Sequence, residues 1–147
     1  MAASYRHTQT GTLSLAIVFG LLALIAVAGV RMSWSAELWI AAAVILLCGI
    51  VFSSLTVEIG DGVLECRFGP GPLRKRFALR DIAEARAVRN RWYYGWGIRW
   101  TPRGWLWSVS GLDAVELSLA SGRNFRIGTD RPEELAAAVQ REIAAAP

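Results

Sequence analysis

The sequence predicts a membrane-anchored chain in which a transmembrane hairpin of two helices precedes a mainly-β domain closed by a C-terminal helix. Three observations lead to this fold class: two uncharged apolar runs, then short alternating segments between turn residues, then a helical apolar stripe near the end. Hydrophobic residues make up 54% of the 147 residues and charged residues 19%, whereas an average soluble domain has about 25% charged residues. This composition excludes a disordered tail, a collagen-like fibre and a disulfide scaffold.

The membrane hairpin is predicted from residues 13–30 and 38–55, two runs of 18 residues without a charge. At roughly 1.5 Å per residue, each helix would be about 27 Å long, which suits a hydrocarbon core of about 30 Å. Residues 31–37 form a short polar connector between them. Two alternatives for the first run are a secretory signal peptide, cleaved near residues 26–28, and a buried core helix.

Basic residues indicate how this hairpin is oriented. The tail of residues 1–12 carries Arg6, and the connector carries Arg31 beside Glu37. Four further basic residues follow the second run: Arg67, Arg74, Lys75 and Arg76. Because basic residues accumulate on the cytoplasmic side, we expect a multi-pass protein of the inner (plasma) membrane with both termini cytoplasmic and the connector outside.

Residues 56–147 are expected to form the cytoplasmic domain, with about seven antiparallel strands in a strongly bent sheet or barrel. Asp61-Gly62 is a hairpin signal, because a type I′ turn needs positive φ at its central residues. Further hairpins are predicted at residues 102–103 and 120–122, whereas residues 81–88 fit either a strand or a helix. Alternation predicts these core side chains: Leu64, Cys66, Phe68, Val115, Leu117, Leu119, Phe125 and Ile127.

One amphipathic helix is expected to end the domain, over residues 131–145. Asp130 is a candidate N-cap, and Glu133 stands three residues later, as in a capping box. Leu135, Val139 and Ile143 recur at a spacing of four residues and form the apolar stripe that would close the sheet.

Residues suited to catalysis or metal binding are scarce. The single histidine, His7, lies in the predicted tail, away from the domain. Cys48 and Cys66 fall in different predicted compartments, so we expect neither a disulfide nor a zinc site. The carboxylates alternate with apolar strand residues, which is typical of solvated faces. We therefore expect no enzyme, no cofactor, no metal and no small-molecule substrate.

Aromatic and basic residues concentrate in residues 91–107. Five of them form the candidate lipid or partner surface: Arg91, Trp92, Tyr93, Tyr94 and Trp96. Four interpretations stay open for this segment: core or half-buried residues of the sheet (Trp100, Trp105 and Trp107), an interfacial membrane surface, a protein-binding hot spot, and a nucleic-acid stacking platform. The net charge of +3 on residues 56–147, from 14 basic and 11 acidic residues, disfavours nucleic acid.

Arg74 and Arg76 complete the candidate surface, because they point the same way from a predicted strand about 20 residues beyond the second run. They are either a solvated face or a contact with anionic lipid.

The chain also resembles bacterial pleckstrin-homology-like (PH-like) membrane proteins, a mostly uncharacterised family in which the domain follows two transmembrane helices. Five segments carry the resemblance, namely residues 94–99 (YGWGIR), 103–105 (RGW), 110–111 (SG), 114–117 (AVEL) and 122–130 (GRNFRIGTD), followed by Pro132 and Leu135. It implies the fold but almost nothing about a reaction. The function we expect is a membrane-anchored, non-enzymatic interaction or scaffold module with a protein partner or a second copy of the chain. A sensor of anionic lipid surfaces is the alternative. The acidic first hairpin at Asp61 departs from eukaryotic lipid-binding PH domains, so specific phosphoinositide binding is not expected.

Overall fold

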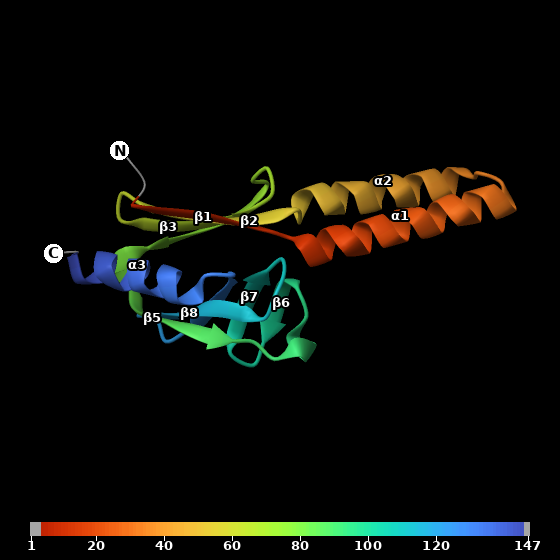
Figure 1. Ribbon diagram of the computed structural model, residues 1–147. Helices are drawn as coiled ribbons and strands as arrows, with labels where there is room; N and C mark the ends of the chain where they lie inside the picture. Colours follow the sequence, from red (N-terminus) through yellow and green to blue (C-terminus); the bar gives the residue numbers. More distant parts are fainter. Residues whose placement is uncertain (1–3, 146–147) are drawn as a thin grey trace.

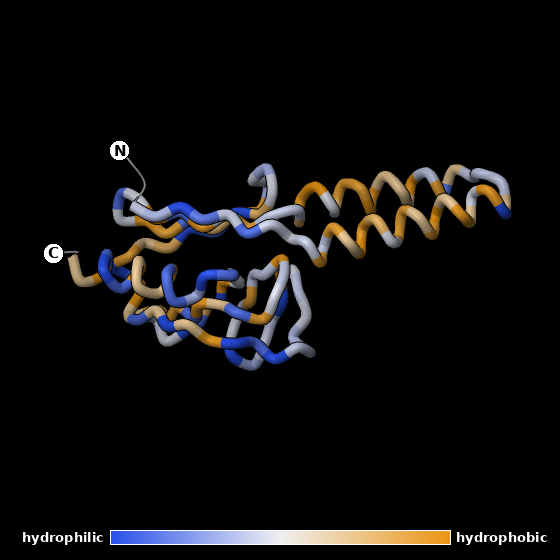
Figure 2. The backbone as a smooth tube through the Cα atoms, viewed as in Figure 1, coloured by the Kyte–Doolittle hydropathy of each residue, from blue (hydrophilic) through white to orange (hydrophobic). Residues whose placement is uncertain are grey.

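A helical hairpin projects from one end of a domain of two β-sheets in the computed structural model, which describes residues 4–145 (Figure 1). Helix α1 spans Thr12–Met32 and helix α2 spans Ala36–Val51. The two helices lie side by side and are hydrophobic along most of their length (Figure 2). The N-terminal part of the chain is thus helical, and the remainder is mainly β with one C-terminal helix.

Helix α1 has the length and apolar composition needed to cross a membrane. It has 21 residues, or about 31 Å at roughly 1.5 Å per residue. Helix α2 has 16 residues and is shorter than expected, because the second apolar run does not stay helical to residue 55. Leu55 belongs to the next strand instead, where its side chain is buried in the β domain. The boundary drawn at residue 55 was therefore wrong.

The N-terminal residues do not form a separate tail. Tyr5–Thr10 form strand β1, which pairs antiparallel with strand β2, Ser54–Gly60. Six residue pairs join the two strands, and the Thr8 and Thr56 hydroxyls lie 2.9 Å apart across them. The β domain therefore contains residues from both sides of the helical hairpin, which corrects the division at residue 56.

The first sheet has the strand order β1-β2-β3-β4 and the second has the order β5-β8-β9-β7-β6. The remaining strands are β3 Val63–Phe68, β4 Leu73–Ala78, β5 Ile82–Arg89, β6 Gly97–Thr101, β7 Gly104–Ser108, β8 Asp113–Leu119 and β9 Asn124–Gly128. Residues 4–145 thus hold nine strands rather than seven, in two sheets rather than a closed barrel. Strands β7 and β9 pair in parallel, so the expectation of a wholly antiparallel sheet was also wrong.

The predicted turns are present. Asp61 and Gly62 adopt positive φ angles of 51° and 75° between β2 and β3, as a type I′ hairpin requires. The ambiguous segment at residues 81–88 is strand β5, preceded by the short 3-10 helix η1, Leu79–Asp81. Its three alanines and one glutamate favour a helix locally, but pairing with β8 gives its backbone groups their hydrogen-bond partners.

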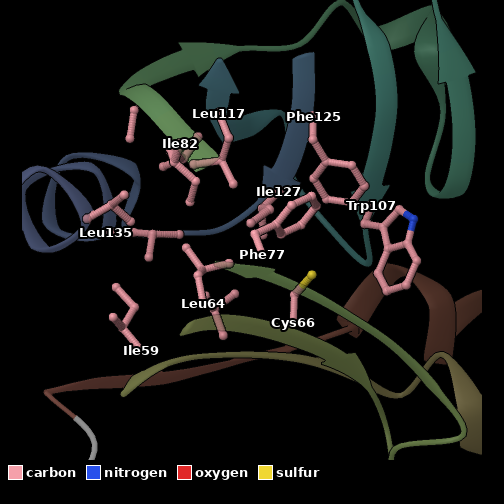
Figure 3. Close-up of a cluster of buried hydrophobic side chains, with 14 of the residues drawn as sticks. Ile59, Leu64, Cys66, Phe77, Ile82, Trp107, Leu117, Phe125, Ile127 and Leu135 are labelled. Atoms are coloured by element: carbon pink, nitrogen blue, oxygen red, sulfur yellow. The ribbon is translucent and has the colours of Figure 1, made fainter. Parts of the chain in front are cut away.

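The core lies between the two sheets and is covered on one side by helix α3, Pro132–Ala145 (Figure 3). The predicted inward residues Leu64, Cys66 and Phe68 are fully buried. Val115, Leu117, Phe125 and Ile127 are buried as predicted, and Leu119 packs against the cluster with partial exposure. Burial raises the pKa of the Cys66 thiol to about 12, so this side chain behaves as an apolar residue.

A buried ion pair contradicts the expectation that the carboxylates lie on solvated faces. Glu116 is 1% exposed, and its carboxylate accepts hydrogen bonds from Arg86 and Arg126 with N–O distances of 2.7 Å. Arg126 also donates to Asn90 Oδ1 at 2.9 Å. Burial by itself would raise the pKa of Glu116, but the hydrogen bonds and charges of the two arginines outweigh it and hold that pKa below its usual value.

Helix α3 packs mainly against β5 and also against β8. Leu135 and Val139 of the predicted stripe are buried, and Ile143 is partly buried against the core. The Gln140 side chain donates to the Ala85 carbonyl at 2.9 Å, which holds the helix in register with β5. The sequence prediction of this helix and its buried face is confirmed.

Val139→Asp should unfold the β domain or bring it close to unfolding. An unpaired charge in the helix–sheet contact costs several kcal/mol, while a whole domain has about 5–15 kcal/mol of stability. Ala137→Asp is the matched control, because Ala137 is exposed on the same helix. Thermal unfolding followed by circular dichroism measures both. Equal melting temperatures for the two variants would mean that α3 does not dock through Val139.

Glu116→Gln should destabilise the protein by about 3–5 kcal/mol at pH 7, because Arg126 would keep its buried charge without a counter-ion. The pKa of Glu116 is lowered in the folded state, so its contribution is complete above its unfolded value of 4.5 and declines as the pH falls below that value. The variant should therefore lose less stability than the parent between pH 5 and pH 3. Denaturant titrations at several pH values test this, with the exposed Glu84→Gln as control.

Candidate interaction surface

The helical hairpin joins the β domain through close backbone contacts at its base. Gly11 N–H donates to the Ser53 carbonyl at 2.7 Å, and Gly69 N–H donates to the Ser54 carbonyl at 2.8 Å. A Cβ atom on Gly69 would lie 2.5 Å from the Ile50 carbonyl oxygen, and its φ of 46° favours glycine as well. The end of α2 is therefore held directly against the first sheet.

The loop after β7 holds the start of α1. The Ser14 hydroxyl donates to the Val109 carbonyl at 3.0 Å, and the hydroxyls of Thr12 and Ser110 lie 3.2 Å apart. On its other side, the same loop accepts a hydrogen bond from Trp96 Nε1 at the Gly111 carbonyl, at 2.8 Å. The predicted surface segment is thus tied to the base of the hairpin through this loop.

A groove of about 560 Å³ separates the base of the hairpin from residues 95–99. Ile17 and Val18 of α1 form one wall together with Phe52, and Trp96 and Arg99 stand opposite. The Arg99 side chain donates to the Trp96 carbonyl at 3.1 Å, so the turn is held by its own residues. In this groove, residues 95–99 lie next to the base of α1 and the end of α2.

The aromatic segment itself is a 3-10 turn, η2, Trp92–Tyr94, at the end of the domain from which the helices leave (green in Figure 1). Trp92 is 75% exposed and Tyr93 56% exposed. Arg91 Nη1 donates to the Tyr93 hydroxyl at 2.9 Å, and this hydrogen bond raises the pKa of Arg91. Of the five residues predicted here, Arg91, Trp92 and Tyr93 are thus exposed together, whereas Tyr94 and Trp96 are half-buried.

The tryptophans beyond this turn separate into two groups. Trp107 is buried and contacts Phe68 and Phe125, as the core interpretation predicted. Trp105 is 46% exposed and therefore half-buried, as the same interpretation allowed, whereas Trp100 is 68% exposed, so the interpretation was wrong for Trp100.

Arg74 and Arg76 lie on β4 of the first sheet, whereas residues 91–96 connect two strands of the second sheet. Arg74 is opposite Arg67 on β3, and Arg76 forms an ion pair with Glu65. Arg76 also lines a groove with Trp100 and Trp105. Sequence alternation could not reveal this grouping, because it joins strands from two different sheets.

His7 is part of the domain, contrary to the expectation. Its Nε2 atom lies 2.5 Å from Asp130 Oδ1, because pairing of β1 with β2 brings the histidine to the start of α3. The carboxylate predicted to cap α3 therefore contacts the imidazole. Within residues 4–145, no hydroxyl or thiol is hydrogen-bonded to His7, and no group of three potential metal ligands is present.

No protein-family model matches the chain, and no curated protein is significantly similar to it in sequence. The PH-like resemblance thus rests on the residues quoted for it above. The architecture of two sheets and a C-terminal helix rests on the structure alone.

Proposed function

We propose that the protein is a membrane-anchored, non-enzymatic interaction module, in which a PH-like domain is held at the cytoplasmic face of the membrane. The main support for membrane anchoring is that the helical hairpin is inserted between two paired strands. Because β1 pairs with β2, the chain entering α1 and the chain leaving α2 must lie on the same side of the membrane. If α1 crosses the bilayer, α2 has to bring the chain back.

The exposed surface of the hairpin supports the same proposal. Large apolar side chains cover both helices, including Phe19, Leu24, Ile40 and Leu47, each more than 60% exposed. Soluble monomers rarely expose apolar patches above a few hundred Å², whereas lipid tails solvate such a surface. Helix α2 is about 24 Å long, and a crossing shorter than the hydrocarbon core is accommodated by local thinning of the bilayer. Trp34 and Trp39 stack at 4.7 Å at the far end, where interfacial aromatics are common.

The PH-like assignment of the domain is supported by the order of its elements. A four-stranded and a five-stranded sheet pack against each other, and the C-terminal helix covers the open side of their core. In this proposal the exposed Arg91–Trp96 segment contacts a protein partner or a second copy of the chain, since Trp, Tyr and Arg dominate protein-binding hot spots.

A second candidate function is contact with anionic lipid by the same segment. It is favoured by the position of η2 at the end of the domain from which the helices leave, and by the groove that Gly95 and Trp96 share with α1 and α2. Trp and Tyr prefer the headgroup level of a bilayer, and each arginine near an anionic surface contributes about 1 kcal/mol.

Reporter fusions test the anchoring. A reporter after residue 145 should behave as cytoplasmic, and a reporter inserted in residues 33–35 should behave as external, because the hairpin would cross the bilayer twice. The same cytoplasmic behaviour at both sites would mean that the hairpin does not cross the membrane.

A photo-crosslinking residue at position 92 separates the two functions in living cells. Replacement of Trp92 by p-benzoylphenylalanine should give a protein adduct of one defined mass, because the exposed ring would lie in the interface. The same replacement at the exposed Arg141 is the control. Lipid adducts alone, identified by mass spectrometry, would support the second function and contradict the first.

A further inference from the structure

A second groove, away from the base of the hairpin, opens between the two sheets where the barrel does not close. One wall is the edge strand β4, and the opposite wall is formed by the β6–β7 and β8–β9 turns. Its volume is about 560 Å³, within the range of about 300–1,000 Å³ that small-molecule sites occupy. We call it the basic groove and define it by Lys75, Arg76, Trp100, Arg103, Trp105 and Arg123.

The charges in the basic groove are all of one sign. Four cationic side chains line it, and none of its lining residues is acidic. Arg76 forms an ion pair with Glu65, whereas Lys75, Arg103 and Arg123 form no ion pair with any carboxylate in the part of the chain that the structure describes. Lys75 on β4, Arg103 in the β6–β7 turn and Arg123 in the β8–β9 turn therefore face one cavity without a counter-ion. This arrangement suits an anion with several negative charges.

Two exposed indole rings stand beside these cations. Trp100 and Trp105 are opposite each other on β6 and β7, with ring centroids 5.3 Å apart and planes at 78°. Both lie in the groove lining and both are substantially exposed, so a flat ring can cover them without displacing a core residue. Base–aromatic stacking of this kind is sequence-tolerant and strong for tryptophan-sized rings.

The turn that carries Arg103 is held in place. The Thr101 hydroxyl donates to the Gly104 carbonyl at 2.7 Å and accepts from the Arg103 N–H at 3.2 Å. Gly104 has a φ of 104°, and its backbone packs directly against the Asn124 carbonyl of the neighbouring turn. The cation on one turn is thereby kept next to Arg123 on the other, which reduces the ordering cost of binding a ligand between them.

We infer that the basic groove binds a nucleotide-type ligand, a phosphate ester with several negative charges and a flat ring. Its phosphate oxygens accept hydrogen bonds from Lys75, Arg103 and Arg123, and its ring stacks on the face of Trp100 and contacts the edge of Trp105, since the two indole planes are nearly perpendicular. This inference does not rest on the membrane function, since the groove is built from the β domain alone.

Isothermal titration calorimetry on the full chain in phosphatidylcholine nanodiscs tests the inference, with ATP and inorganic tripolyphosphate as probes and no divalent cation. ATP should bind at least about tenfold more tightly than tripolyphosphate, because only ATP has a ring to stack. The double variant Arg103→Gln/Arg123→Gln should weaken both probes at least about tenfold. Trp100→Leu should weaken ATP alone.

The control is Arg80→Gln/Arg141→Gln, which removes the same charge from exposed positions outside the groove and should leave both affinities unchanged. Circular dichroism melting curves establish that each variant is folded. Failure of the parent to bind ATP, or equal losses in the groove and control variants, would overturn the inference. Loss of ATP binding when phosphatidylglycerol is added to the discs would assign the groove to lipid phosphate and overturn the nucleotide assignment.

Discussion

The antiparallel pairing of β1 with β2 is the constraint on which the rest of the structure depends. It makes the helical hairpin an insertion between two neighbouring strands, so the strand ends that lead into α1 and out of α2 lie one strand spacing apart, or about 4.8 Å. Gly11 and Gly69 then let backbone atoms of the domain approach the end of α2. A flexible tether would leave the domain free to rotate against the hairpin, but two continuous strands and two backbone hydrogen bonds define which end of the domain faces the helices.

The second constraint is electrostatic and lies on the other sheet. Arg86, Glu116 and Arg126 occupy facing positions on β5, β8 and β9, so one row of side chains crosses three strands. A buried ion pair is weak evidence of net stability, since desolvation opposes its Coulomb attraction. Its physical consequence here is that it fixes the register of β5, β8 and β9, because a shift of one strand by one residue would bury at least one charge without a partner. The same sheet presents both η2 and the β6–β7 turn, so registry of its strands also positions both candidate surfaces.

Sequence reasoning succeeded where the periodicity was strong and failed where a residue's role depends on a distant strand. The alternation of Leu64, Cys66 and Phe68 and the spacing of Leu135 and Val139 each define one buried face, and both were predicted. Strand β1 was missed because its sequence, YRHTQT, has little apolar alternation, so its pairing with β2 is what stabilises it. Glu116 was misjudged because a buried carboxylate with two arginine partners has the same alternating pattern as a solvated one. The basic groove joins β4 to two turns of the other sheet, and no local pattern carries that information.

The two candidate surfaces differ in what membrane attachment does for them. In the proposed function, the tether would hold the Arg91–Trp96 segment, at the end of the domain from which the helices leave, near the bilayer surface at a high effective concentration, so weak contacts there would be sufficient. The basic groove lies between the sheets, lined by residues from β4 and from the turns of the second sheet, and gains nothing from that proximity. A ligand there would have to be bound by the groove's own three cations and two rings, and the hydrogen bonds of its turns and the close packing at Gly104 keep these groups in place. A ligand in this groove would also contact β4 and both turns at once and therefore join the two sheets where the barrel is open. Binding there would stiffen the domain while leaving the end next to the helices unchanged, so in the proposed function the two surfaces would act independently.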